Sequence, residues 1–190
     1  LFKKDIVKFV IVKIVYSDGF CSINQTAAYP KYVMPEDVAK LEAKFLDGLN
    51  SEGKLTKNVT IDNNSSSPDF IITVKSLKVE EGEFEQTVND SKSSLNGQKF
   101  YLNKVQCTGV VEVIDGKTNK QIGLSCSNTK SRQEKLKNNR DLGDLITGAN
   151  KDHSVYREKT LRSDIASDLS GDVGRRIWVP ITKRIRKNLK

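Results

Sequence analysis

Two segments with strand-like patterns, 104–114, which is rich in Val, and 120–127, which alternates, stand on either side of a short polar turn, and this arrangement limits the possible folds more than any other feature. Asp115 can accept hydrogen bonds from the backbone of such a turn. Asn119 tolerates the left-handed conformation that closes a tight connection between antiparallel strands. The sequence therefore predicts a β-hairpin here, and with it a sheet as the centre of the fold.

Alternation of apolar and polar residues places one face of this hairpin in the core. The residues predicted to face inward are Val111, Val113, Ile122 and Leu124. Cys107 and Cys126 lie on the same face. In an antiparallel hairpin the residue numbers of each opposite pair have a constant sum. The two cysteines are directly opposite in the register whose sum is 233, and diagonal in the register whose sum is 235. Only the first register brings the Cβ atoms to the roughly 3.5–4.5 Å that a disulfide needs. Two alternatives are open: a Cys107–Cys126 disulfide, or two buried thiols that pack as small hydrophobic groups.

Gly116, Lys117 and Thr118 also match the end of a phosphate-binding loop. That motif requires a glycine five residues before Gly116 and a helix after the threonine. Position 111 is valine, and the residues after Thr118 alternate like a strand. We therefore interpret these three residues as part of a turn.

The rest of the chain predicts an α+β fold, with a single antiparallel or mixed sheet and helices packed mainly on one face. Strands are expected at 6–16, 58–62 and 69–79, and polar loops at 17–32 and 80–98; residues 127–154 show no clean period and are left open. A helix is expected from Pro35, with Val38, Leu41, Phe45 and Leu49 on its apolar face and Gly53 as its stop. We expect the strand at 6–16 to be buried on both faces.

The C-terminal part repeats an apolar residue every fourth position. The series is Leu161, Ile165, Leu169, Val173, Ile177, Ile181, Ile185 and Leu189. Pro180 interrupts it, which predicts a kink or two consecutive helices. We expect one domain over residues 1–190, whose C-terminal helix at 180–190 is either kinked or separate.

This C-terminal segment is the best functional candidate, because residues 175–190 hold seven Lys or Arg and no acid, in a chain of net charge +8. The candidate interaction residues are Arg176, Lys183, Arg184, Arg186 and Lys187. Three alternatives are open for them: the solvated outer face of a packed helix, a site for an anionic lipid or glycan surface, and a nucleic-acid site. Gly171 and Gly174 are expected to allow close helix packing.

The sequence gives little support for a catalytic site or a metal site. His153 is the single histidine, and the three cysteines have no C-x-x-C spacing, so we expect neither a catalytic triad nor a zinc site. The acidic residues Glu80, Glu81, Glu83 and Glu85 lack the pattern of a calcium loop and are interpreted as a solvated acidic loop. The sequence predicts a non-enzyme without cofactor or metal.

Two short stretches resemble a group of bacterial envelope lipoproteins, which includes the peptidoglycan-synthase activator LpoB, the periplasmic domain of the curli secretion protein CsgG and the lipopolysaccharide-assembly protein LptE. In the first stretch Asp69, Phe70, Ile71 and Ile72 match; in the second, Val113, Asp115, Thr118, Lys120 and Ile122 match, with Asn119 in place of a glycine. The resemblance implies an exported protein, periplasmic or associated with the outer membrane, that acts as an accessory or assembly module by contact with other envelope proteins. The alternative is a basic nucleic-acid-binding module that uses the C-terminal helix.

The start of the chain adds one expectation. It begins with Leu rather than Met, and the residues before Cys21 do not form a lipobox. A removed signal peptide would therefore be invisible in this sequence, and a lipid anchor, if the protein has one, is expected upstream of Leu1.

Overall fold

The structure is a computed structural model that describes residues 6, 8–26, 32–138 and 155–189. Its strands are β1 (Val10–Val15), β2 (Cys21–Gln25), β3 (Val59–Ile61), β4 (Phe70–Thr87), β5 (Lys99–Asp115), β6 (Cys126–Gln133), β7 (Lys135–Asn138) and β8 (Val155–Glu158). Its helices are the 3-10 turn η1 (Pro35–Asp37), α1 (Val38–Leu55), α3 (Ile165–Arg176) and α4 (Trp178–Asn188). His153 lies outside the described residues.

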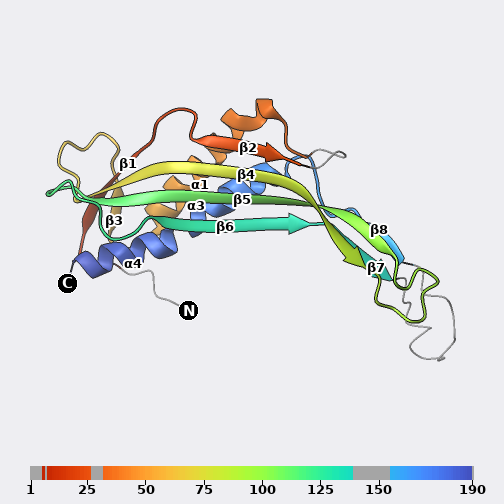
Figure 1. The fold of residues 1–190 in the computed structure, drawn as a ribbon. Coiled ribbons are helices and arrows are strands. Elements are labelled where there is room, and N and C mark those ends of the chain that lie inside the picture. The colour runs from red at the N-terminus through yellow and green to blue at the C-terminus, as the bar shows by residue number, and fades with distance from the viewer. Residues whose placement is uncertain (1–5, 7, 27–31, 139–154, 190) are drawn as a thin grey trace.

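A mixed sheet forms the centre of the molecule, in the order β3-β1-β4-β5-β6, with β2 paired to the later part of β4. β1 runs parallel to β3 and β4, and β2 runs parallel to β4, whereas β4, β5 and β6 are antiparallel neighbours. Helices α1 and α3 lie against one side of this sheet (Figure 1). The predicted α+β class, a mixed sheet with helices on one face, is confirmed.

β1 is covered on one face only, which corrects the prediction of a strand buried on both. Val10, Val12 and Ile14 face the helices and are buried, but Ile11 on the opposite face is 38% exposed. Among the described residues, no helix covers the outer face of the sheet, so the alternate side chains of β1 stay partly exposed there (Figure 1).

A β-bulge at Lys75 changes which residues of β4 face the helices. The register with β5 shifts between Val74 and Ser76. An added residue inverts the alternation of a strand. Ile72 and Val74 are therefore buried before the bulge, and Leu77 after it, as the sequence predicted for all three.

Two segments predicted as loops contain strands. β4 continues to Thr87, so the loop expected at 80–98 is confined to its second half. β2 lies within the predicted loop 17–32 and pairs in parallel with Leu77–Glu81. The added part of β4 carries Glu81, Glu83 and Glu85 and is polar on both sides, and β2 is only five residues long, so neither shows a clean alternation over enough residues to predict a strand.

Helices α1 and α3 approach so closely that their backbones touch. A Cβ atom added to Gly48 would collide with the carbonyl of Gly171, and one added to Gly174 would collide with the carbonyl of Phe45. On the sheet below, Gly109 leaves room for the ring of Phe45, since a Cβ there would lie 2.6 Å from its Cε2 atom. The predicted role of Gly174 in close helix packing is thus confirmed, whereas at Gly171 the approach depends on Gly48 of α1, because a Cβ on Gly171 itself would lie 3.6 Å from the nearest atom.

The C-terminal region is two consecutive helices that meet at Ile177, three residues before the expected break at Pro180. Pro180 lies in the first turn of α4, where a missing N–H costs nothing. A spacing of four residues advances the apolar stripe about 40° per step around a helix of 3.6 residues per turn. One straight helix could not bury the whole series, and the break turns Ile181 and Ile185 back toward the core.

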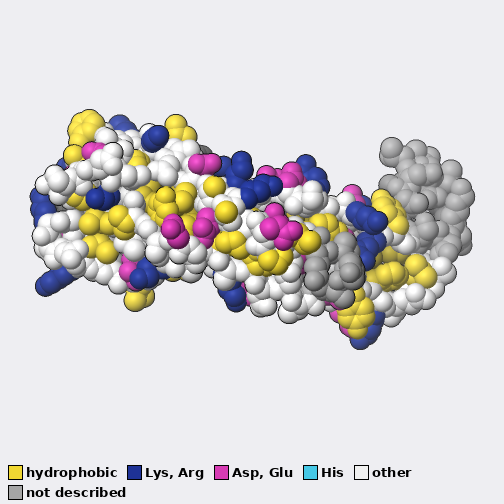
Figure 2. All heavy atoms as spheres, turned by 90° about the horizontal axis from the view of Figure 1, so that it is seen from above, with side chains coloured by type: hydrophobic (Ala, Val, Ile, Leu, Met, Phe, Trp, Pro, Cys, Tyr) yellow, Lys and Arg dark blue, Asp and Glu magenta, His cyan; other side chains and the backbone are white. Residues whose placement is uncertain are grey.

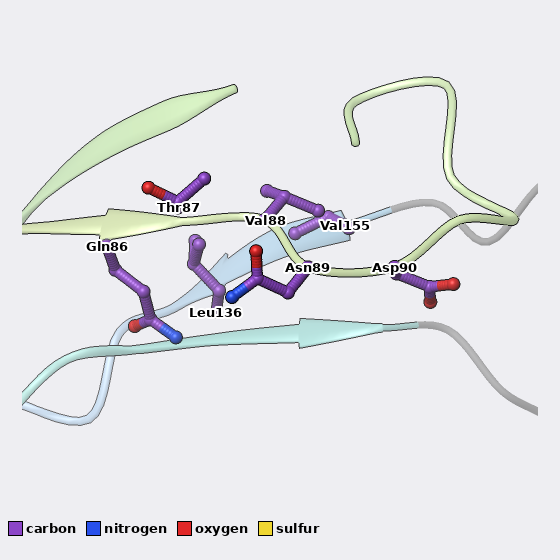
Figure 3. A pocket seen from close by; sticks show the side chains of 7 residues that line it. All are labelled: Gln86, Thr87, Val88, Asn89, Asp90, Leu136 and Val155. Atoms are coloured by element: carbon purple, nitrogen blue, oxygen red, sulfur yellow. The ribbon is translucent and has the colours of Figure 1, made fainter. Parts of the chain in front are cut away.

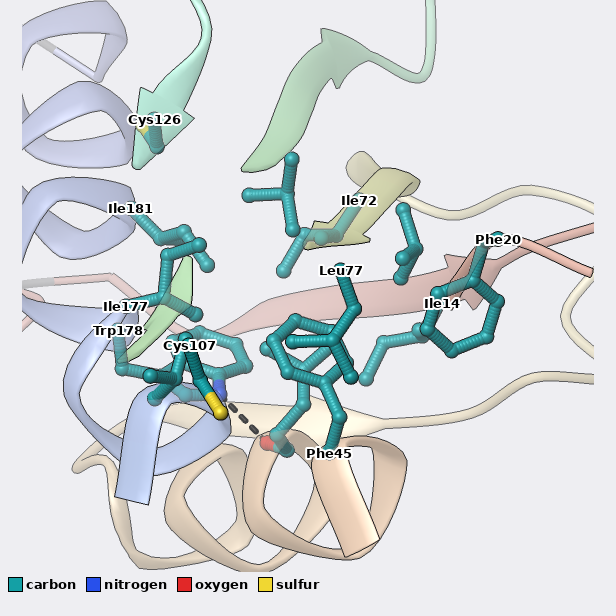
Figure 4. Packing of buried hydrophobic residues seen from close by; sticks show 14 of the residues in the cluster. Ile14, Phe20, Phe45, Ile72, Leu77, Cys107, Cys126, Ile177, Trp178 and Ile181 are labelled. Atoms are coloured by element: carbon teal, nitrogen blue, oxygen red, sulfur yellow. Dashed lines mark hydrogen bonds between the residues drawn. The ribbon is translucent and has the colours of Figure 1, made fainter. Parts of the chain in front are cut away.

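Trp178 follows the break and is fully buried in the apolar cluster, beside Ile177 and Cys107 (Figure 4). Its indole packs on Gly53, where a Cβ would lie 2.5 Å from the ring. Gly53 is therefore not the helix stop that the sequence predicted. Helix α1 continues to Leu55, and the glycine is needed for the close approach of the indole.

Candidate functional site

The turn after β5 is closed by its own first side chain. Asp115 Oδ1 accepts hydrogen bonds from the N–H groups of Thr118 (2.8 Å) and Lys117 (2.9 Å), and Asn119 adopts a left-handed φ of 54°. The Thr118 N–H, then the Asn188 side chain, stabilise the charged carboxylate and lower the pKa of Asp115 below its ordinary 3.8. The predicted hairpin turn is confirmed, and the N–H groups that would surround a phosphate already bind Asp115.

The turn is joined to the start of β4. The Gly116 N–H donates to the Asp69 carbonyl at 2.8 Å, and a Cβ at Gly116 would collide with the Pro68 carbonyl. The Asp69 carboxylate accepts a hydrogen bond from the Ile11 N–H at 2.9 Å, which holds β1 in register. Position 116 therefore requires glycine for close backbone approach.

After the turn, the chain pairs with β5 in a register that changes along its length. Next to the turn, Ile114 pairs with Gln121, which is the register whose residue numbers sum to 235. Farther along, β5 and β6 pair in the register whose sum is 237. The shift occurs through a bend at Gly123, whose φ is 68°. Leu124 is consequently 80% exposed, which corrects its predicted place in the core.

This register separates the two cysteines that the sequence placed on one face. Cys126 pairs with Val111, while Cys107 pairs with Lys130. They lie four residues apart along the strands, about 13 Å. Of the two alternatives for these residues, the structure shows two free, buried thiols and no disulfide between Cys107 and Cys126.

The cysteine environments favour neutral thiols. Burial raises the pKa of Cys107 to about 12, and its Sγ lies 3.7 Å from the Ala166 carbonyl oxygen and 3.8 Å from Ser170 Oγ. Burial, then the charge of Glu42, raises the pKa of Cys21 to about 11. Because the thiolate is the nucleophile, these two residues are poorly suited to covalent chemistry at neutral pH.

Helix α4 packs along the segment between the hairpin turn and β6 (Figure 1). At its C-terminal end the Asn188 side chain donates to Asp115 Oδ2 at 3.1 Å. One turn earlier, the Arg184 guanidinium lies over Gly123 and interacts with the Cys126 thiol, opposing the rise in its pKa that burial causes. Residues 184 and 188 thus face the hairpin.

The structure separates the predicted interaction residues into different environments. Arg176 is exposed at the end of α3, before the break. On α4, Lys183 and Lys187 are exposed, whereas Arg184 and Arg186 are half-buried. The apolar side of α4, with Trp178, Ile181 and Ile185, is wholly buried.

Tertiary structure adds two lysines to this group. Lys117 and Lys120 are exposed in the turn that α4 contacts, so they share one end of the molecule with the cations of α4. We call this surface the basic end, and define it by Lys117, Lys120, Lys183, Arg184 and Lys187. No described carboxylate forms an ion pair with Lys117, Lys120 or Lys187. Elsewhere, on the face in Figure 2, positive and negative side chains are mixed along the molecule.

Two buried carboxylates were missed in the sequence. Glu81, predicted to be in a solvated acidic loop, is 1% exposed and accepts hydrogen bonds from the N–H groups of Tyr32 (2.7 Å) and Val33 (3.2 Å). Glu134, also 1% exposed, binds the Arg157 guanidinium and accepts a hydrogen bond from the Asn103 N–H at 2.9 Å. Both carboxylates join segments distant in sequence, so no local pattern identifies them.

A hollow of about 210 Å³ lies beyond the helices, between the end of β4 and the β7–β8 pair (Figure 3). It is lined by Gln86, Thr87, Val88, Asn89, Asp90, Leu136 and Val155. Asp90 is the one titratable residue among these seven, so the lining offers no pair of groups for acid–base catalysis.

Within the described parts of the chain, no three His, Cys, Asp or Glu side chains are placed to hold a metal ion. Among those same residues, no helix is long and apolar enough to cross a bilayer.

Comparison with known proteins finds no matching family model and no matching curated protein. Solved structures with a similar course of the chain include a neuraminyllactose-binding hemagglutinin homolog from Helicobacter pylori, at 12% identity and a TM-score of 0.49, covering 98% of this chain and 90% of that one. A minor lipoprotein from Acinetobacter baumannii has 12% identity and a TM-score of 0.35, with 95% and 94% covered. Lipoprotein B from Nitrosomonas europaea has 11% identity and a TM-score of 0.39, with 95% and 86% covered. With these TM-scores below 0.5, the likenesses assign neither a family nor a function.

Proposed function

We propose that this chain is a non-catalytic component of the bacterial cell envelope, exported to the periplasm or the outer membrane, that acts by binding other envelope proteins. The observation that carries the proposal is the joining of the two stretches that resemble envelope lipoproteins. Phe70 pairs with Asp115 across β4 and β5, and the Gly116 N–H binds the Asp69 carbonyl. The matched residues therefore form one tertiary unit, which makes a chance match of two unrelated segments a weaker explanation.

The chemistry of the reactive side chains supports a role in binding. Cys107 and Cys21 are buried, with pKa values raised to about 12 and about 11. The buried carboxylates of Glu81 and Glu134 are occupied by backbone N–H groups and by Arg157. Groups held in this way stabilise the fold and are not available to a substrate.

The location is tested with the complete gene product in its own bacterium. Osmotic release of the periplasm and separation of the membranes should place the protein in an envelope fraction, with a known cytosolic enzyme as the control. Recovery with that cytosolic enzyme would overturn the proposal.

Contact with a protein partner is tested by photo-crosslinking in the same cells. A photoreactive residue is placed at Thr129 on the outer face of the sheet, and in a second strain at Tyr101, which is 61% exposed on β5. A discrete adduct with one envelope protein is expected from at least one position. A buried position, Leu169, serves as the control.

A further inference from the structure

Two aliphatic side chains project from the surface beside the basic end. Leu124 is 80% exposed, and it follows Gly123, over which the Arg184 guanidinium lies. Val179 is 40% exposed and precedes Lys183 by one turn on the outer side of α4. Cations flanked by exposed aliphatic groups are typical of proteins that bind at a membrane surface.

We propose that the basic end docks on an anionic phospholipid surface, with its cations against the headgroups and Leu124 and Val179 entering the headgroup layer. The inference does not depend on the proposed function, because it requires no protein partner and concerns a different surface from the sheet.

The burial of α4 determines the mode of binding. Trp178, Ile181 and Ile185 are 0% exposed, so the apolar side of this helix is already used in the core. Insertion of α4 as an amphipathic helix would require the core to open. Binding is therefore shallow and electrostatic, and it weakens as salt screens the charges.

The charges available are set by tertiary contacts. The Asn188–Asp115 hydrogen bond holds the end of α4 against the turn that carries Lys117 and Lys120. The one acidic side chain in that turn, Asp115, is occupied by the turn's N–H groups and by Asn188. The surface therefore presents cations from two segments that are more than sixty residues apart in sequence.

A lipid surface fits these features better than a nucleic acid. Leu124 and Val179 gain free energy by leaving water for the acyl boundary. Sites for single-stranded nucleic acid use aromatic side chains on which bases stack, and an aliphatic side chain offers no such surface. Sites for duplex DNA use hydrogen-bond donors to the phosphates, which an aliphatic side chain lacks.

The test measures sedimentation of the whole chain with vesicles. One set is pure phosphatidylcholine, and in the other about a third of the lipid is phosphatidylglycerol. We expect binding to the anionic set alone, with loss at high salt. Because each lysine near an anionic surface contributes about fivefold, the double variant Lys120→Gln, Lys187→Gln should bind about 25-fold less tightly.

Matched variants distinguish binding through this surface from a general effect of net charge. Lys92→Gln with Lys135→Gln removes two positive charges at the opposite end of the molecule, and should change binding less than twofold. Leu124→Ser should weaken binding about threefold, whereas Leu124→Phe should preserve or strengthen it. Circular dichroism checks that each variant remains folded.

The proposal is overturned by any of three results. These are equal loss from the two lysine pairs, equal binding to both vesicle sets, and displacement from vesicles by duplex DNA at concentrations that leave a known lipid-binding protein bound. The last result would assign the basic end to nucleic acid.

Discussion

The indole N–H of Trp178 donates a hydrogen bond to the carbonyl oxygen of Leu49, over 2.5 Å and across 129 residues of sequence (Figure 4). It ties the first residue of α4 to α1. Together with the contact on Gly53, it determines the direction in which α4 leaves α3. The basic end exists because α4 takes that direction toward the hairpin.

Replacing Trp178 should therefore destabilise the fold strongly. We expect Trp178→Ala to lower the free energy of unfolding by about 3–5 kcal/mol, since it empties a fully buried ring site. Trp178→Phe should cost less, but still about 1–2 kcal/mol, because a phenyl ring lacks the N–H donor. Urea unfolding followed by circular dichroism measures both, and a Phe variant as stable as the natural chain would contradict the role of the hydrogen bond.

Two glycines of α3 should respond to the same substitution in opposite directions. Gly174→Ala places a methyl group against the Phe45 carbonyl and should destabilise the protein by about 2 kcal/mol or more. At Gly171 the nearest atom to an added Cβ is 3.6 Å away, an ordinary contact. Gly171→Ala should therefore raise stability by up to about 1 kcal/mol through helix propensity. Equal effects in thermal unfolding would refute the close contact of α1 and α3 at Gly174.

The cysteines should behave as three shielded thiols. At pH 8 the native protein should react slowly with a thiol reagent at Cys107 and Cys126, and unfolding in denaturant should expose three reactive groups without any reductant. The midpoint of unfolding should be the same with and without reductant. An unfolding midpoint that depends on the reductant would indicate that a disulfide is present.

The raised pKa of Cys107 also predicts a pH dependence at the alkaline side. The folded thiol, with a pKa of about 12, keeps its proton where the unfolded thiol, near 9.0, loses it. The stability from this difference is present below about pH 9 and is lost as pH rises from 9 toward 12. Compared with Cys107→Ala, the natural chain should lose more stability over this range.

Asp115 predicts a pH dependence at the acid side. Its pKa is lowered in the folded state, so its contribution to stability is present above the ordinary value of 3.8 and is lost as the pH falls through the lowered pKa. The difference in unfolding free energy between the natural chain and Asp115→Ala should therefore shrink below about pH 4. A constant difference from pH 3 to 7 would show that the carboxylate charge does not hold the turn.

The Glu134–Arg157 pair should hold β8 to the sheet. Arg157→Met leaves the buried carboxylate without its cation and should cost about 3 kcal/mol. Adding Glu134→Gln should recover part of that loss, because an amide tolerates burial without a counter-charge. Hydrogen exchange should show the effect first in β7 and β8, and additivity of the two substitutions would contradict their coupling.

Elements with a strong local pattern were predictable from the sequence. The apolar face of α1, the hairpin turn with Asp115 and Asn119, and the inward residues of β4 all depend on spacing within one segment. β2 and the second half of β4 were missed, because β2 is only five residues long and pairs with a distant strand, and because Glu81, Glu83 and Glu85 interrupt the apolar pattern of β4. Of the candidate interaction residues, the sequence identified the basic content and the apolar side of α4, but not that Arg184 lies against the hairpin at Gly123.

Periodicity and turn chemistry act over a few residues, so the sequence was sufficient to predict the α+β class, the hairpin and the positive charge of the C-terminal segment. Tertiary structure decided the strand register, and with it the separation of Cys107 from Cys126. It also decided that α4 buries its apolar side and carries its cations beside Lys117 and Lys120. These outcomes depend on packing between distant segments, such as Trp178 on Gly53, whose free energy appears only when those segments meet.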